Sequence, residues 1–260
     1  MSQDTASDPG DWSDFFVVVP MYNEAGGVAT TLRALGAQSD TDFSLVLVDN
    51  GSTDATVAIA KAVAAGLPGL RMHMIHEPQK GTGTAADAGF RHAIALGARW
   101  IARTDADCIP RRDWVRQLKQ ALVEQKLEFV AGKLRPRDDE PLRPVDRLLI
   151  PVALWAAENY GGLFRFGRQF KYPYIMVSGA NLGISATLYV ECGGFPHTAI
   201  EDVHEDRAMS ERIRTITNRA ALLPNLIVQH SARRLRAYGY VNTLRWYRNH
   251  GYRPRVVDVR

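Results

Sequence analysis

Apolar runs and amphipathic stretches alternate through the first half of the chain. The first run, residues 14–24, is rich in aromatic and β-branched residues, which is typical of a strand buried on both faces of a sheet. The apolar runs predict strands within residues 14–24, 43–50, 71–76, 99–105 and 128–136. The stretches between them predict helices over residues 29–36, 54–66, 85–97 and 113–125. Because strands that alternate with helices are joined by right-handed crossovers, this pattern predicts an α/β fold with a doubly wound, mostly parallel sheet.

Polar residues follow each of the first four predicted strands. These strand ends read PMYNE, DNGSTD, HEPQKG and TDADC. The carboxyl ends of parallel strands lie at one edge of a sheet, and such folds bind their ligands there. We therefore expect the four segments to form one site. After residue 136 the alternation weakens, and the proline-rich, charged segment 135–144 predicts a loop that leaves the first half.

Two aspartates, Asp105 and Asp107, follow the fourth strand one residue apart. In an extended chain alternate side chains point the same way, so the two carboxylates would project together. A divalent cation, Mn²⁺ or Mg²⁺, would neutralise the pair and also bind phosphate oxygens. The alternative is a polar turn, in which Pro110 ends the sheet and aspartate acts as a turn former.

The composition is that of an ordinary globular protein, with 46% apolar residues in 260. No apolar run approaches the roughly 20 residues that a membrane-spanning helix requires, and the acidic, polar N-terminus is unlike a secretory signal. We therefore expect a soluble, cytoplasmic protein. Cys108 and Cys192 are too few for a disulfide framework or an all-cysteine zinc site.

The net charge is +4, and the positive charge gathers at the C-terminus. Residues 230–260 contain eight arginines against one acid, Asp258, with aromatic residues between them. Such a segment could bind nucleic acid or an anionic membrane, or close over the phosphates of a small ligand. A solvated terminal helix is the plain alternative.

A glycine-rich segment, residues 81–86, fits the G-x-G-x-x-A form of the dinucleotide fingerprint. A predicted strand precedes it, a helix follows it and Asp105 lies downstream, so an NAD-type oxidoreductase is a competing hypothesis. Against it, the residues EPQK separate the strand from the first glycine. A dinucleotide site would also leave Asp49 and Asp107 without a role.

An activated sugar nucleotide would use more of the predicted edge. Asp49 can accept a hydrogen bond from a base, and a metal on Asp105 and Asp107 can hold the diphosphate and stabilise the charge that builds on it as it leaves. Lys80 could add a further positive charge there.

Several ordered motifs match one enzyme family. They are VVVPMYNE, LVLVDNGSTDAT, QKGTGTAADAGFRHA, RTDADC, SGANLGIS, ECGGF and EDRAMSERI. On these motifs the chain resembles the family 2 glycosyltransferases with the GT-A fold. The resemblance implies a sheet with a smaller acceptor-side subregion, and a nucleoside-diphosphate sugar donor, with UDP favoured. It implies transfer of a hexosyl group to a hydroxyl of a small molecule, a glycan or a lipid-linked acceptor. It implies no nucleic-acid partner and leaves room for peripheral membrane contact.

The resemblance also assigns roles to individual residues. On the donor side it implies that Pro20, Tyr22 and Glu24 line the nucleoside pocket, that Asp49 contacts the base, and that Lys80 and Gly81 lie in the donor loop. It implies that Asp105 lies near the ribose or the metal and that Asp107 ligates the metal. The acceptor side would be built from Gly179, Asn181 and Gly194. His230, at the end of the predicted strand LLPNLIVQH, is a further candidate metal ligand or phosphate contact.

The catalytic base of inverting members is the aspartate of an E-D motif, with an apolar residue three positions later and an arginine six later. The chain offers two such pairs in EDVHEDRAMSERI. Asp206 has Met209 and Arg212 at those positions, whereas Asp202 does not fit. We therefore expect Asp206 to accept the acceptor's proton, with Glu205 beside it to orient the acceptor, and the sugar to be transferred with inversion. A retaining GT-A transferase is the alternative.

The chain is expected to be organised in four parts. They are a disordered N-terminus (1–14), a nucleotide-sugar-binding half (15–134), an acceptor-binding and catalytic-base half (135–230) and a basic C-terminal segment (231–260).

Overall fold

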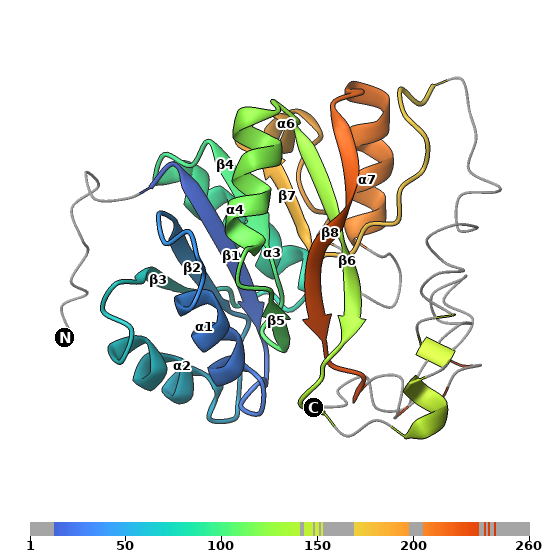
Figure 1. Cartoon of the computed structure of the whole chain (residues 1–260). Helices are drawn as coiled ribbons and strands as arrows, with labels where there is room; N and C mark the ends of the chain where they lie inside the picture. The colour runs from blue at the N-terminus through green and yellow to red at the C-terminus, as the bar shows by residue number, and fades with distance from the viewer. Residues whose placement is uncertain are drawn as a thin grey trace.

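The computed structural model describes residues 13–140, 143–147, 149–150, 152, 169–197, 205–233, 237, 239 and 242. These residues form one eight-stranded sheet with the strand order β3-β2-β1-β4-β7-β6-β8-β5, covered by helices on both faces (Figure 1). The expected α/β class with a mixed, mostly parallel sheet is confirmed.

The first half of the sheet is entirely parallel. Its strands are β1 (Phe15–Met21), β2 (Ser44–Asp49), β3 (Arg71–His76) and β4 (Trp100–Arg103), linked by the helices α1 (Val28–Gly36), α2 (Thr56–Ala65) and α3 (Thr82–Ala95). Met21 pairs with Asp49, and Asp49 pairs with His76. The three strands therefore end level with one another, and their polar loops share one edge as the sequence predicted.

The second half of the sheet is mixed. Its strands are β5 (Cys108–Pro110), β6 (Phe129–Pro136), β7 (Leu182–Ser185) and β8 (Ala220–His230), with the helices α4 (Trp114–Lys119), α6 (Ala186–Glu191) and α7 (Glu205–Ile216) and a π-helical turn, η2 (Gln120–Glu124). β7 lies antiparallel between β4 and β6, while β6 and β8 are parallel. The sequence pattern missed β7, because four buried residues are too few to show a period.

The short strand β5 was also missed. It pairs antiparallel with β8 at the outer edge of the sheet, and Pro110 pairs there with Val228. Proline is tolerated at a sheet edge because no further strand needs its missing N–H group. Pro110 therefore ends the strand but does not prevent it.

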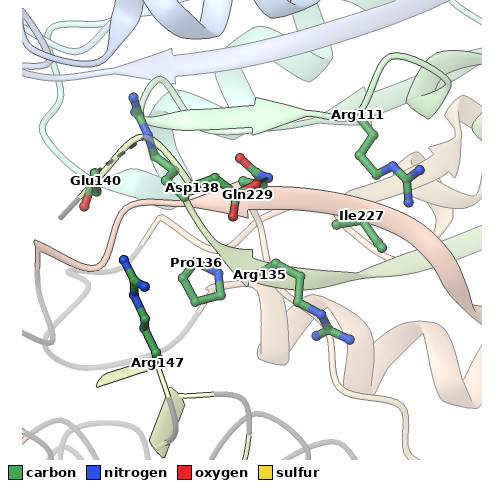
Figure 2. A pocket seen from close by; sticks show the side chains of 9 residues that line it. Arg111, Arg135, Pro136, Asp138, Glu140, Arg147, Ile227 and Gln229 are labelled. Atoms are coloured by element: carbon green, nitrogen blue, oxygen red, sulfur yellow. Dashed lines mark hydrogen bonds and ion pairs between the residues drawn. The ribbon is translucent and has the colours of Figure 1, made fainter. Parts of the chain in front are cut away.

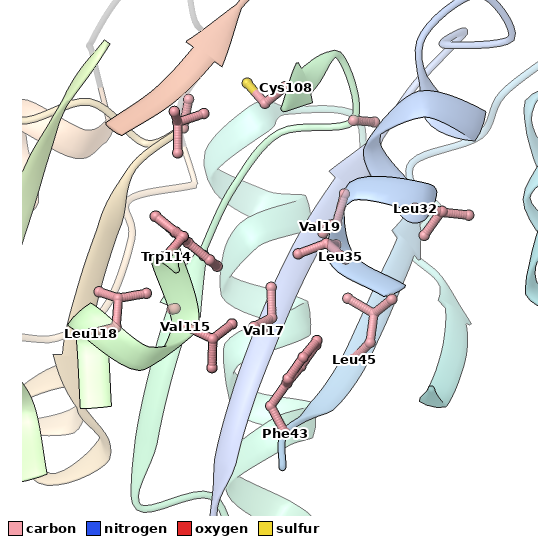
Figure 3. Packing of buried hydrophobic residues seen from close by; sticks show 14 of the residues in the cluster. Val17, Val19, Leu32, Leu35, Phe43, Leu45, Cys108, Trp114, Val115 and Leu118 are labelled. Atoms are coloured by element: carbon pink, nitrogen blue, oxygen red, sulfur yellow. The ribbon is translucent and has the colours of Figure 1, made fainter. Parts of the chain in front are cut away.

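Alternate residues of β1 enter two different cores, which explains its continuous apolar sequence. Val17 and Val19 face α1 and α4, where they belong to the same cluster as Leu32, Leu35 and Trp114 (Figure 3). The opposite face packs against α3, α6 and α7 through Phe16, Val18, Phe90, Tyr189 and Met209. The sheet is thus the middle layer of three.

Three boundaries differ from the expectations. Ser13, placed by the sequence in a disordered end, donates its backbone N–H to the Ser44 hydroxyl and is buried. Helix α3 begins at Thr82, inside the glycine-rich segment, and the helix expected over 113–125 changes to π-helical geometry at Gln120. Within the ranges described above, no helix combines the length and the apolar character needed to cross a bilayer.

Candidate active site

Asp49 lies at the end of β2 with both carboxylate oxygens engaged. Oδ1 accepts the backbone N–H of Ser52 at 3.0 Å, and Oδ2 lies 3.0 Å from Nδ1 of His76 on the neighbouring strand. Burial acts to raise the pKa of Asp49, but the hydrogen bonds from Ser52 and His76 outweigh it and hold the pKa below its ordinary value. Asp49 is therefore a fixed, ionised hydrogen-bond acceptor at the strand edge.

The donor loop expected at Lys80 and Gly81 is tied to the end of β2 through Asn50. The Asn50 side chain accepts the Gly81 N–H at 2.9 Å and donates to the carbonyls of Glu77 and Gln79. Lys80 Nζ donates to the Tyr22 hydroxyl at 2.8 Å and lies 4.2 Å from the centre of its ring. Tyr22 and Lys80, predicted as donor-side residues from separate motifs, are thus in contact, and Pro20 lies next to Met21 near the end of β1.

Asp107 lies at a second cluster, where β5 and β8 meet. The pairing of Cys108 with His230 brings His230 Nε2 to 3.8 Å from Asp107 Oδ2. Arg233 donates to the same oxygen at 3.1 Å and to Glu24 Oε2 at 2.7 Å. Burial would raise the pKa of Asp107, but His230 and Arg233 lower it below the ordinary value. This carboxylate is therefore ionised and already attracts cations.

The donor set at this cluster fits a divalent metal ion. Ligand atoms of Asp107, Cys108 and His230 lie within 4.8 Å of one another. Burial, together with the charges of Asp107 and Asp105, raises the pKa of the Cys108 thiol well above its ordinary value, so its sulfur is a neutral and weak ligand. A carboxylate with an imidazole suits Mn²⁺, and the carboxylate alone also suits Mg²⁺.

Asp105 has different partners from Asp107, and the expected side-by-side projection is wrong. Strand β4 ends at Arg103, and a turn follows in which the Cys108 N–H donates to the Asp105 carbonyl at 3.1 Å. Because the backbone is not extended at these positions, the two side chains do not alternate as in a strand. Asp105 Oδ1 accepts from Nε and Nη2 of Arg103, each at 3.2 Å.

Glu205 and Asp206 open helix α7 beside the same arginine. Glu205 Oε1 accepts from Arg103 at 3.2 Å, and Asp206 Oδ2 accepts the backbone N–H of Gly179 at 2.9 Å. Burial raises the pKa of both carboxyl groups, while Arg103 acts against that rise, as does the Gly179 N–H at Asp206. The predicted base and the predicted acceptor segment SGAN are therefore in direct contact.

Two other residues predicted on the acceptor side, Asn181 and Gly194, make contacts that stabilise the fold. The Asn181 side chain is fully buried, donates to the carbonyls of Lys133 and Leu226, and accepts from Trp114 Nε1 at 2.8 Å, so it joins β6, β8 and α4. Gly194 has a φ of +67°, and a Cβ there would lie 2.6 Å from Asp87 Oδ1. Only glycine fits that turn without strain.

A hollow of about 700 Å³ lies beside these clusters, at the ends of β6 and β8 (Figure 2). None of the predicted site residues lines it. Four arginines do, namely Arg111, Arg135, Arg137 and Arg147, together with Asp138 and Glu140. Arg137 also donates to the backbone carbonyl of Asp107 at 3.2 Å, so the hollow adjoins the cluster of Asp107, Cys108 and His230.

Sequence reasoning missed Arg103 and Arg137, and it treated Arg233 only as part of a basic tail. Arg103 carried a usable signal, because an arginine inside an apolar strand, two residues before an aspartate, needs a buried acidic partner. Arg233 carried none, since its partners are more than a hundred residues away in sequence. Asp202 and most of the C-terminal segment lie outside the described residues.

Comparison with known proteins decides the family. The model of "Glycosyl transferase family 2" matches residues 16–192, which is more than half of the chain. The chain belongs to this family. Membership favours the glycosyltransferase interpretation of the glycine-rich segment over a dinucleotide fingerprint, in agreement with the four residues, 77–80, that separate the end of β3 from Gly81.

Two curated relatives illustrate the similarity. Glycosyltransferase AglE of Haloferax volcanii is 27% identical over 72% of this chain and 58% of its own length. An undecaprenyl-phosphate 4-deoxy-4-formamido-L-arabinose transferase of Shewanella sediminis is 26% identical over 86% of this chain and 69% of its own length. The chain thus spans little more than half of AglE.

Solved glycosyltransferases share the fold. The Pyrobaculum calidifontis mannosyltransferase PcManGT, in complex with GDP-Man and Mn²⁺, superposes with a TM-score of 0.66 at 23% identity and covers 95% of this chain and 64% of that one. Staphylococcus aureus TarS 1–349, in complex with UDP-GlcNAc, gives a TM-score of 0.61 at 16% identity over 84% of this chain and 58% of that one. The expected GT-A-like fold of this family is confirmed.

Proposed function

We propose that this protein is a metal-dependent glycosyltransferase that moves a hexosyl group from a nucleoside-diphosphate sugar, UDP-linked by preference, to an acceptor hydroxyl with inversion. One observation carries the proposal. Asp206, hydrogen-bonded to Gly179, belongs to the same arginine-centred cluster as Asp105 of the D-x-D motif. A base and a donor-binding motif in one cluster are what a direct transfer needs, because the two substrates must meet within reach of both.

The donor side supplies complementary contacts. Asp49 presents an ionised carboxylate to the base or ribose, and Lys80, held against Tyr22, presents a positive charge to the phosphates. Asp107 and His230 would hold a divalent cation, which supplies charge stabilisation for the departing diphosphate. The mannosyltransferase neighbour with GDP-Man and Mn²⁺ and the TarS neighbour with UDP-GlcNAc support a donor and a metal of this kind.

Asp206 would perform the proton transfer. As the acceptor oxygen forms its bond to the anomeric carbon, the bond from that carbon to the diphosphate breaks, and the hydroxyl proton passes to the Asp206 carboxylate. Burial raises the pKa of Asp206, which makes the carboxylate a stronger base than an exposed aspartate. Attack opposite the leaving group inverts the anomeric configuration.

The acceptor class is suggested by charge. The hollow with four arginines adjoins Asp107 and would suit an acceptor that carries phosphate. Two curated relatives are named for transfer to undecaprenyl phosphate and to dolichyl phosphate. We therefore favour a lipid-linked saccharide, which carries phosphate on the lipid and a free hydroxyl on the sugar, over a small molecule or a free glycan.

The test is a donor and acceptor panel. Purified protein is incubated with UDP-, GDP- and dTDP-sugars, with Mn²⁺, Mg²⁺ or EDTA, and with an undecaprenyl-diphosphate-linked sugar or simple glycosides, and release of the nucleoside diphosphate is measured. We expect metal-dependent release with one donor class and a product of inverted configuration by NMR. Full turnover in EDTA would exclude the metal-dependent mechanism, and a product of retained configuration would favour the retaining alternative.

A further inference from the structure

Arg103 is the last residue of β4, and its side chain is only 1% exposed. Burying a guanidinium is costly unless it is fully paired. Its hydrogen bonds go to two carboxylates that are a hundred residues apart in sequence, those of Asp105 and Glu205, with donor-acceptor distances of 3.2 Å. One side chain therefore links the D-x-D motif to the start of helix α7.

The guanidinium is also held in place by its neighbours. A Cβ at Gly179 would lie 2.7 Å from Cζ of Arg103, so this glycine is what makes room for the cation. The ring of Phe195 covers it, with the ring centre 5.2 Å from Cζ. Gly179 and Phe195 come from the two segments SGAN and GGF, so Arg103 is enclosed by the predicted acceptor side.

We propose that Arg103 is a positioning residue that couples the donor half of the site to the acceptor half. Its planar fork fixes Asp105 and Glu205 relative to each other, and so holds the first turn of α7 where Asp206 meets the acceptor hydroxyl. This role rests on the proposed glycosyl transfer. Lysine cannot replace it fully, because an ammonium is a single point of charge and cannot grip two carboxylates as a fork does.

The same contact sets the charge around the base. The charged and polar groups that face Asp206 are Arg103 and Asp105 from the β4 side, Glu205 from its own helix, and the backbone N–H groups of Gly179 and Arg207. Arg103 is the one cation among three carboxyl groups in this set. Without it, the mutual repulsion of the carboxylates would favour protonation, and Asp206 would be a poorer proton acceptor at neutral pH.

The experiment compares three variants with a control at the residue that precedes the same strand. Arg103→Met removes the cation, Arg103→Lys keeps the charge, and Arg103→Met with Glu205→Gln removes one buried charge of each sign, so that folding is preserved if Arg103→Met alone unfolds. Arg99→Met is the control, since the Arg99 side chain is 73% exposed and lies at the opposite end of β4. For each folded variant we measure kcat, donor KM, the pH dependence of kcat and the ¹³C chemical-shift titration of the Asp206 carboxyl carbon.

Arg103→Met should lower kcat about 100-fold or more, as expected for the loss of a group that aligns the reacting atoms. It should also move the acidic limb of the kcat profile upward by about one pH unit, with little change in donor KM. Arg103→Lys should restore the acidic limb but not the full kcat. A variant that loses kcat while the acidic limb and the Asp206 titration stay unchanged would show a merely structural role and overturn the proposal.

The NMR titration separates this inference from the proposed function. If the unaltered protein transfers no sugar from any donor, the glycosyltransferase proposal fails. The Asp206 carboxyl titration then still decides whether Arg103 controls that charge. An Asp206 titration that is identical with and without Arg103 would reject the coupling in either case.

Discussion

Two arginines each bridge a pair of carboxylates in this site, and they differ in how deeply they are buried. Arg103 joins Asp105 to Glu205 with its side chain 1% exposed, whereas Arg233 joins Glu24 to Asp107 with its side chain 28% exposed. Arg103 belongs to a central strand, while Arg233 follows the end of β8. Both clusters pair one arginine with two carboxylates, but the arginine is buried in the first and partly exposed in the second.

This difference in burial indicates which of the two arginines a bound metal ion can displace from its carboxylates. Removing one partner of a buried ion pair typically costs about 3–5 kcal/mol, whereas an exposed pair contributes about 0–1 kcal/mol. The Arg103 cluster is therefore expected to stay intact throughout a catalytic cycle. Arg233 stands where Asp107 and His230 would hold a metal ion, and because it is only partly buried we expect it to leave Asp107 more readily than Arg103 leaves its partners.

The largest effect is expected from the base in the buried cluster. Asp206→Asn removes the proton acceptor and should lower kcat by roughly 10²–10⁴-fold. Donor affinity should barely change, because Asp206 contacts the acceptor segment at Gly179. Steady-state kinetics and calorimetric titration with the donor measure both quantities.

Two neighbouring acids serve as comparisons for that variant. Glu205→Gln should have an intermediate effect, because Arg103 still holds the side chain but one charge is lost. Asp202→Asn should be far milder. An Asp206→Asn enzyme near the rate of the unaltered protein would reassign the base and leave α7 with a purely structural role.

The next effect comes from breaking the partly buried cluster around Asp107. Asp107→Ala removes the main charged metal ligand, and we expect turnover to fall about 100-fold or more, together with the stimulation by Mn²⁺. The exposed acid Glu124, on η2, gives a matched control as Glu124→Ala. Mn²⁺ binding measured by electron paramagnetic resonance should be lost in Asp107→Ala alone. Undiminished Mn²⁺ binding in that variant would move the metal away from Asp107.

Arg233→Gln tests the comparison further, because we expect it to strengthen Mn²⁺ binding and to weaken donor binding. Without the competing cation, Asp107 should bind Mn²⁺ more tightly in the absence of nucleotide, by a few-fold or more, because the Arg233–Asp107 pair is partly buried. The donor KM should rise, since the arginine no longer contacts the diphosphate. Calorimetry with Mn²⁺ alone and with donor separates these two changes. Weaker Mn²⁺ binding would mean that Arg233 supports the metal instead of competing with it.

The smallest effect concerns pH and lies outside both clusters. Burial, and then the adjacent His73, lower the pKa of His92 in the folded protein. The unfolded chain therefore binds more protons than the folded protein below about pH 6.5. The stability that the neutral His92 contributes is lost as the pH falls from there toward the pKa of His92 in the folded protein. His92→Gln should shrink the difference between the free energies of unfolding at pH 7.5 and pH 5.5, measured by urea titration, by less than about 1 kcal/mol. An unchanged difference would place the acid sensitivity elsewhere.

Local patterns were enough to predict much of this protein. The continuous apolar runs predicted the four parallel strands and the edge at which their polar ends meet, because burial on both faces leaves no polar position in a strand. The structure also brings the glycine loop and the segment of Asp206 to the site, through the contacts of Asn50 with Gly81 and of Asp206 with Gly179. The role of Asp206 as base stays a prediction.

Only the tertiary structure decided how the carboxylates are partnered. The sequence placed Asp105 and Asp107 together, but the turn after Arg103 brings Asp105 to Arg103, which also holds Glu205, and brings Asp107 to His230 and Arg233. Strands β5 and β7 were invisible for the same reason, since each is short and depends on its neighbours in the sheet for its hydrogen bonds. A local pattern records which side chains are buried. Which distant residue pairs with a given charged side chain depends on how the crossovers bring the strand ends together. No local periodicity in the sequence encodes that.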